Sequence, residues 1–170
     1  MKKFMVLVMA LVFSAALLAI ETESVKNLTQ EDSLKATAVT LTAVQTAKIQ
    51  AAMGTKQPVK TAYAVYIGKT DAVVIEEQMG KWGPIKFAID IDKKERKVKS
   101  IEIFSMQEKR GVAVKTAGFL KQYVGKSTAD TLEVGKDIRG VSGATISSKA
   151  VTTAVKRALL VYNEAFPAAK

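Results

Sequence analysis

The sequence contains no cysteine and no histidine among its 170 residues. Without cysteine, the chain has no disulfide, no thiolate metal site, no thioether-linked haem and no lipid-modified cysteine. The absence of histidine removes the commonest general base and a frequent metal ligand. Any chemistry therefore depends on carboxylates, lysine, tyrosine and hydroxyl groups.

Acidic residues are the scarcer charged class, because 16 Asp and Glu face 26 Lys and Arg for a net charge of +10. Such a charge suits an anionic membrane surface, nucleic acid or an acidic protein partner. The densest basic run, residues 93–99, has no aromatic residue among its charges and lies between two strand patterns. This is typical of a solvated hairpin turn, so we expect no nucleic-acid partner. Contact with a membrane surface stays open.

Long apolar runs are also rare, and the clearest one is residues 4–20, directly after Lys2 and Lys3. A positive start, an apolar run and small residues at its end are typical of a secretory signal peptide. We predict a signal peptide over residues 1–19, with cleavage near Ala19. The alternative is an uncleaved signal anchor, because a run of this length is at the short end of what spans a bilayer. Both cases predict an exported protein in a periplasmic or other extracytoplasmic location.

Residues 20–57 are predicted to form a linker and one long N-terminal helix. Residues 29–32 resemble a capping box, and Gly54 suits the position that follows a helix. The apolar residues between them recur at helical spacing, at Leu34, Ala38, Leu41, Val44, Ala47 and Ala51. Pro58 then marks the predicted start of the compact domain, residues 58–170.

Four strand patterns follow Pro58. Two β-rich runs, residues 63–67 and 72–75, are separated by a short turn. In residues 85–91 large apolar side chains alternate with Lys86, Ala88 and Asp90, which is typical of a half-buried strand, and residues 97–106 provide the next strand after a turn. The pattern predicts an antiparallel sheet with one solvated face.

The second half of the chain is predicted to be mainly helical. Residues 112–124 and 147–166 show helical spacing, and residues 131–134 could form a short strand. Hairpins come first and helices later, without regular alternation. The predicted fold class is therefore α+β: an antiparallel sheet of hairpins packed with helices, preceded by one long N-terminal helix.

A run of small and hydroxyl residues, 140–149, leads into the last predicted helix. The first N–H groups of a helix have no intrahelical partner and lie in positive potential, so they can bind a phosphate. Gly140 and Gly143 let the backbone approach a ligand closely. The same residues also suit an ordinary loop and helix cap, and chemistry alone leaves both interpretations open.

Residues from about Gly83 to Leu160 resemble the FMN-binding domain family, which includes the flavin subunits of the Rnf complex and of the Na⁺-translocating NADH:quinone reductase. The most specific feature is Ser-Gly-Ala-Thr at residues 142–145, followed by further hydroxyl residues. The stretches that carry the resemblance, in the family's order, are residues 83–92, 97–104, 119–126 and 141–151.

The resemblance implies FMN as the cofactor, joined through a phosphoester bond to Thr145 by a flavin transferase. The N–H groups of Ile146 to Ser148 are expected near the phosphate, with Lys149 balancing its charge. For Ser147, Ser148 and Lys149, simple capping and solvation is the alternative. The residues expected to bind the cofactor around this point are Ser142, Gly143, Ala144, Thr145, Ile146, Ser147, Ser148 and Lys149.

Glu108 and Gly111 keep the ends of a family segment whose middle differs here, and we expect them to contact the flavin ring or a redox partner. A charged turn before a helix is the alternative for these two residues. Arg139 stands where relatives often carry an acidic residue, and Asp137 lies further back. Non-covalent binding of FMN therefore stays open. The aromatic residues that could stack on the ring, or equally lie in the core, are Tyr63, Tyr66, Trp82 and Tyr123.

The implied function is that of an exported flavoprotein that transfers electrons between a membrane or soluble donor and a partner reductase. Its expected partners are the transferase and a redox protein or membrane electron-transfer complex. We expect an electron-transfer protein or redox subunit, with no catalytic residue or metal ligand of its own. The alternative is a non-redox exported binding or structural module with a phosphate-binding loop.

Overall fold

A computed structural model describes residues 22–168, apart from residues 30, 32, 56–57 and 109–110. The predicted signal peptide, residues 1–19, and the alternative anchor, residues 4–20, lie outside this range and stay predictions. Within the part of the chain that is described, no helix has the length and apolar character needed to cross a membrane.

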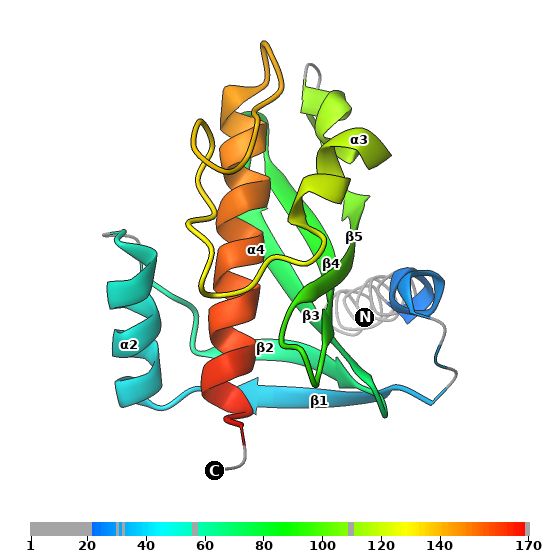
Figure 1. The fold of residues 1–170 in the computed structure, drawn as a ribbon, viewed down its shortest axis with the longest axis vertical. Helices are drawn as coiled ribbons and strands as arrows, with labels where there is room; N and C mark the ends of the chain where they lie inside the picture. Colours follow the sequence, from blue (N-terminus) through cyan, green and yellow to red (C-terminus); the bar gives the residue numbers. More distant parts are fainter. Residues whose placement is uncertain (1–21, 30, 32, 56–57, 109–110, 169–170) are drawn as a thin grey trace, which may run out of the picture.

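The described fold is organised around a five-stranded sheet in which each strand pairs antiparallel with the next in sequence. Figure 1 shows the sheet with the longest helix lying along it. The hairpins that the strand patterns predicted are confirmed, and the architecture is α+β. The strands are β1 (Lys35–Thr40), β2 (Ala62–Ile67), β3 (Asp71–Met79), β4 (Pro84–Asp92) and β5 (Val98–Ser105).

One face of the sheet is covered by α4 (Thr145–Ala165), which packs against β3 and β4 and carries α2 (Ala43–Met53) on its other side. The alternating side chains of β4 meet the apolar stripe of α4 in the main core. Each fully buried aliphatic or aromatic side chain contributes roughly 1.5–3 kcal/mol. Core residues with no exposed surface include Phe87, Ile89, Ile91, Val151, Val155 and Leu159.

The single long helix predicted over residues 29–54 is wrong. Residues 35–40 form β1, which pairs with β2 along its whole length at the edge of the sheet. The helical capping box begins at Thr42 instead, where the hydroxyl accepts the N–H of Gln45 at 3.3 Å and the Gln45 side chain accepts the N–H of Thr42 at 2.9 Å. Gly54 does end the helix, in the left-handed conformation at φ 62°.

Spacing misled this prediction because alanine and threonine at these intervals fit a strand as well as a helix. The free backbone edge of β2 decides the matter, since pairing with it satisfies the N–H and C=O groups of β1. The sheet therefore includes residues that precede the boundary expected at Pro58. Residues 30 and 32 of the predicted capping box lie outside the described residues.

The continuous helix predicted over residues 112–124 is also wrong. The chain forms the 3₁₀ helix η1 (Gly111–Lys115), a single turn α3 (Ala117–Leu120) and a second 3₁₀ helix η2 (Lys121–Tyr123). The break falls at Thr116, whose extended backbone starts a new helix. Residues 131–134 form no strand of their own and contribute only an isolated bridge between Val134 and Ile138. The final helix is confirmed and begins at Thr145.

Candidate functional site

The hydroxyl-rich run folds back onto the first turn of α4. Gly143 has a φ of 75°, which places a tight turn directly before the helix. The N–H of Ala144 donates to the carbonyl of Val141 at 3.0 Å, and the N–H of Val141 donates to the hydroxyl of Ser148 at 3.0 Å. These bonds close the loop against the helix, so the start of α4 is held in a defined geometry.

Thr145 is the first residue of the 21-residue helix α4 and its side chain is exposed. Within the described residues, its hydroxyl and the N–H groups of Thr145, Ile146 and Ser147 have no hydrogen-bond partner. Such N–H groups can bind an anion, and the helix dipole favours negative charge there. A reactive hydroxyl and an anion-binding backbone therefore lie at one point.

Ser147 and Ser148 are both buried, and each hydroxyl is used within the protein. Ser147 donates to Oε2 of Glu108 at 2.7 Å, and Ser148 accepts the N–H of Val141. The N–H of Ser148 is also engaged, because it donates to the carbonyl of Ala144 at 2.9 Å. For these two side chains the geometry matches the capping alternative. The N–H groups open to a ligand are those of residues 145–147, one position earlier than expected.

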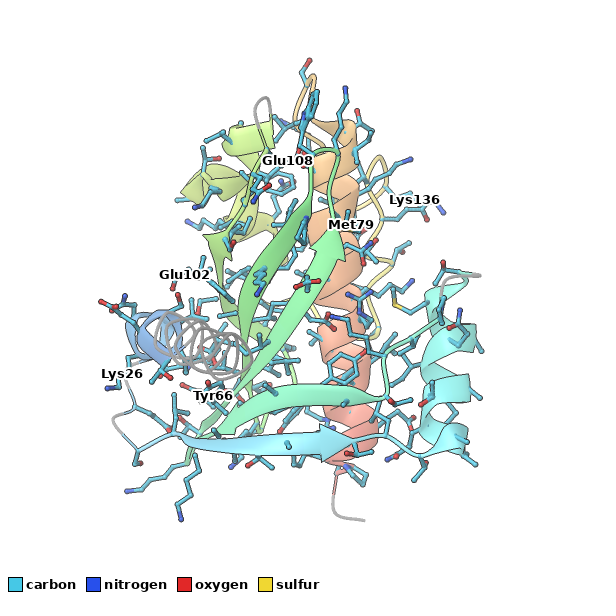
Figure 2. All side chains as sticks on the ribbon, turned by 180° about the vertical axis from the view of Figure 1, so that it is seen from behind. Lys26, Tyr66, Met79, Glu102, Glu108 and Lys136 are labelled. Atoms are coloured by element: carbon cyan, nitrogen blue, oxygen red, sulfur yellow. The ribbon has the colours of Figure 1, made fainter. Side chains whose placement is uncertain are left out.

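Glu108 joins the start of α4 to the loop that precedes β4. Its Oε1 accepts the N–H of Trp82 at 3.0 Å, while Oε2 accepts the Ser147 hydroxyl. Burial raises the pKa of Glu108, but the bonds from Trp82, Ser147 and the Lys81 N–H together hold it below its usual value. Figure 2 shows Glu108 at the same end of the sheet as Met79, the last residue of β3. Glu108 is therefore ionised, and it connects the loop at Trp82 to the first turn of α4.

Gly111 packs so closely against Ser147 and Glu108 that there is no room for a side chain. A Cβ at this position would come within 2.3 Å of the Ser147 hydroxyl and 3.0 Å of Glu108 Oε2. We expect Gly111→Ala to lower the free energy of unfolding by about 1–3 kcal/mol, measured by urea titration. Gly118→Ala is the matched control, since nothing lies within 4 Å of a Cβ there. Equal stability of the two variants would contradict the close packing at Gly111.

A hollow of about 210 Å³ opens beside Thr145. Trp82 has half of its surface exposed there, at 50%, and the ammonium group of Lys81 lies 5.5 Å from its ring centroid. Tyr63, Tyr66 and Tyr123 are buried instead. The residues that line this hollow are Lys81, Trp82, Glu108, Gly111, Gly143, Ala144, Thr145, Ile146 and Ser147.

Lys81 is the charged residue at the hollow that sequence reasoning missed. The sequence did contain a hint of this role, because Lys81 stands next to the single tryptophan in a loop bounded by Gly80 and Gly83. That loop is far from residues 140–149 in sequence, and only the folded sheet brings it to the start of α4. Lys149, expected to balance a phosphate, instead lines a separate hollow of about 300 Å³ with Met79 and Ile146.

The segment before the hydroxyl run is held by backbone contacts. Gln122 bonds both backbone groups of Arg139, accepting its N–H at 2.8 Å and donating to its carbonyl at 3.2 Å. Asp137 accepts the N–H groups of Leu132 and Glu133. Burial raises the pKa of Asp137, but these backbone bonds outweigh it and lower the pKa to about 2. Asp137 therefore acts as a turn-forming residue, and Ser142 is exposed in the turn that follows.

Comparison with known proteins places this site inside a recognised domain. Residues 80–160 match the family model described as "FMN-binding domain". The chain is also similar to the crystal structure of one subunit of the Na(+)-translocating NADH-quinone reductase from Parabacteroides distasonis, with a TM-score of 0.54 and 16% identity over 81% of this chain and 80% of that chain. At that identity the likeness shows a shared fold. No curated protein matches the sequence.

Proposed function

Because residues 80–160 belong to the FMN-binding domain family and FMN is its cofactor, we propose that the chain is an exported flavoprotein that transfers electrons between a membrane or soluble donor and a partner reductase. We propose further that FMN is joined to Thr145 through a phosphoester bond. FMN supplies the one- and two-electron chemistry.

The observation that carries the proposal is the exposed hydroxyl of Thr145 beside the free N–H groups of the α4 N-terminus. An ester at this oxygen would place the phosphate next to those groups without displacing any bond of the described protein. Of the four hydroxyl residues in the run, Ser147 and Ser148 are buried, while Ser142 and Thr145 are exposed. Only Thr145 combines exposure with a place in the helix.

The rest of the site would orient the cofactor. Lys81 lies at the hollow beside Thr145 and would balance phosphate charge, and the exposed face of Trp82 offers a stacking surface. Glu108 would act as a positioning residue, because it bonds the Trp82 backbone and the first turn of α4 through Ser147. The hollow is open to solvent at its exposed residues, so a partner protein could come close to a bound flavin.

The proposed partners follow from the same argument. A flavin transferase would form the ester, and export by residues 1–19 would bring the chain to it. The similar solved structure is a subunit of a Na(+)-translocating NADH-quinone reductase. This supports a role for the chain beside or within a membrane electron-transfer complex.

The colour and intact mass of the purified protein test whether the chain carries FMN and whether the FMN is covalently attached. The full chain would be produced in a host with and without a flavin transferase. We expect a yellow protein whose mass exceeds the polypeptide by FMN minus water, only when the transferase is present. A colourless protein at the unmodified mass in both hosts would instead favour a non-redox module. Yellow protein that loses its flavin on denaturation would keep FMN and exclude the ester.

A further inference from the structure

The face of the sheet opposite α4 is covered by a short N-terminal segment. Residues 22–28 form a helix that lies on this face, apart from α4 (Figure 1). Val25 is 1% exposed and forms a small second core with Tyr66, Val73 and Ala88. This cluster is much smaller than the main core, so little apolar contact holds the segment in place.

Asp90 lies within this covered face. It pairs in register with Val73 on β3 and Ser100 on β5, so its side chain shares the face of the second core. The residue is 1% exposed. Its Oδ2 accepts the Ser100 hydroxyl at 3.3 Å, whereas Oδ1 has no hydrogen-bond partner within the described residues. A buried carboxyl group with one unsatisfied oxygen is costly to keep ionised.

The end of the segment is linked to this carboxyl group through Ser100. The same Ser100 hydroxyl is 3.4 Å from the carbonyl of Leu28 and thus connects the segment to Asp90. Thr29, the next residue, has a buried hydroxyl that also lacks a partner among the described residues. The segment and the sheet therefore each bury one polar atom that has no partner among the described residues.

The neighbouring charges do not compensate Asp90. Lys99 is 2.6 and 2.7 Å from the two oxygens of Asp71, so its ammonium group is committed there. Burial and repulsion by Asp71 raise the pKa of Asp90, Lys99 and Ser100 oppose the rise only in part, and the pKa is about 7. On the segment, Glu23 and Lys26 are exposed, and Figure 2 shows Glu102 and Tyr66 on either side of it.

We propose that residues 22–29 form a proton-controlled strap, which covers the outer face of the sheet while Asp90 is protonated and releases it when Asp90 ionises. Release would let water reach the carboxylate and would expose the apolar side chains of Tyr66, Val73 and Ala88. This inference is independent of FMN binding, since the strap and the α4 N-terminus lie on different faces.

The direction of the pH dependence follows from linkage. In the covered state the pKa of Asp90 is about 7, and once water reaches the group it returns toward its ordinary value of 3.8. The covered state therefore binds the proton more tightly, and covering is strongest below the ordinary value. It weakens as pH rises, by up to about tenfold per pH unit, and levels off above the raised pKa.

A single spin label can report the strap, because the chain has no cysteine. Asn27 is exposed, so Asn27→Cys in the full chain, kept in detergent micelles, places the label on the strap without disturbing its contacts. We expect an immobilised spectrum at acidic pH that becomes mobile as pH rises toward 8. The additional change Val25→Ser, which removes the central apolar contact, provides the mobile reference.

The variant Asp90→Asn tests whether the increase in label mobility at high pH comes from ionisation of Asp90 or from a general loosening of the protein. The neutral amide cannot ionise, so the label should stay immobilised at pH 8, while Glu102→Gln should follow the pH dependence of the parent protein. A label equally immobile at both ends of the pH range in the parent protein overturns the proposal, even if Asp90→Asn fails to fold. So does an Asp90→Asn variant that releases the strap as the parent does.

Discussion

Thr145→Val is expected to abolish covalent attachment of FMN while leaving the protein folded. Valine has nearly the shape of threonine but lacks the oxygen that the ester requires. The Thr145 side chain is exposed and makes no hydrogen bond within the described residues, so its loss should cost only a few tenths of a kcal/mol through helix propensity. Intact mass and flavin fluorescence after denaturation, both measured on protein produced with a transferase, would show the loss.

Two matched variants sharpen this expectation. Thr145→Ser keeps a hydroxyl at the same place and should keep at least part of the flavin. Ser142→Ala removes the other exposed hydroxyl of the run and should leave the mass gain unchanged. If Thr145→Val still carries covalent FMN and Ser142→Ala does not, then Ser142 is the acceptor. A Thr145→Val protein that binds FMN only reversibly would show that the N–H groups of α4 hold the phosphate without the ester.

Arg157→Met is expected to produce the largest loss of stability. Arg157 on α4 reaches β3, where its Nη2 lies 2.7 Å from Oε2 of Glu76 and its Nη1 lies 2.9 Å from the side-chain oxygen of Gln78. The Glu76 side chain has no exposed surface. Removing the guanidinium leaves a buried carboxylate without a counter-charge, which typically costs about 3–5 kcal/mol. Urea unfolding at two pH values measures this.

The loss should depend on pH. Burial raises the pKa of Glu76, and the bonds from Arg157 oppose that rise. Without Arg157 the pKa of Glu76 in the folded protein rises further. Glu76 then keeps its proton in the folded variant at pH values where it has lost it in the unfolded chain. Its stability therefore falls as pH rises from the ordinary glutamate pKa toward the raised one. We expect a smaller loss at pH 5 than at pH 8.

The control for Arg157→Met is the double variant with Glu76→Leu. Replacing both partners with apolar residues removes the uncompensated charge and should recover most of the stability, because such replacements are often neutral or favourable. Flavin attachment should be unaffected in the double variant, since neither residue lines the hollow beside Thr145. A single variant as stable as the parent at pH 8 would show that the ion pair does not anchor α4.

The strands were predictable because their signal is local. In residues 85–91 a large apolar side chain stands at every second position, and a period of two predicts a strand. The solvated face that this pattern predicted is wrong for β4, because Ala88 and Asp90 on that face are buried as well. The start of α4 was equally predictable, because a run of small and hydroxyl residues followed by an apolar stripe is typical of a helix N-terminus. In residues 34–51 the spacing suited a helix and a strand equally. Residues 35–40 form a strand because their backbone groups pair with the edge of β2.

The site was predictable only in part. Sequence analysis pointed to Thr145 and its neighbours, and it left two roles open for Ser147, Ser148 and Glu108: contact with the cofactor, or a cap or charged turn. Burial commits Ser147 to Glu108 and Ser148 to Val141, and neither contact follows from spacing. Lys81 and Trp82 reach the hollow because β3 and β4 end beside the start of α4, which depends on strand register and helix packing.

The sequence by itself determined the hairpins, the last helix and the position of the hydroxyl run, because each depends on periodicity and residue chemistry within a few neighbours. Only the tertiary structure decided which hydroxyl residues of that run stay exposed, which loop lies beside them, and that Asp90 is buried on the face covered by residues 22–28. These outcomes depend on which segments, far apart in the sequence, pack against each other and exclude water, and tertiary packing alone determines that.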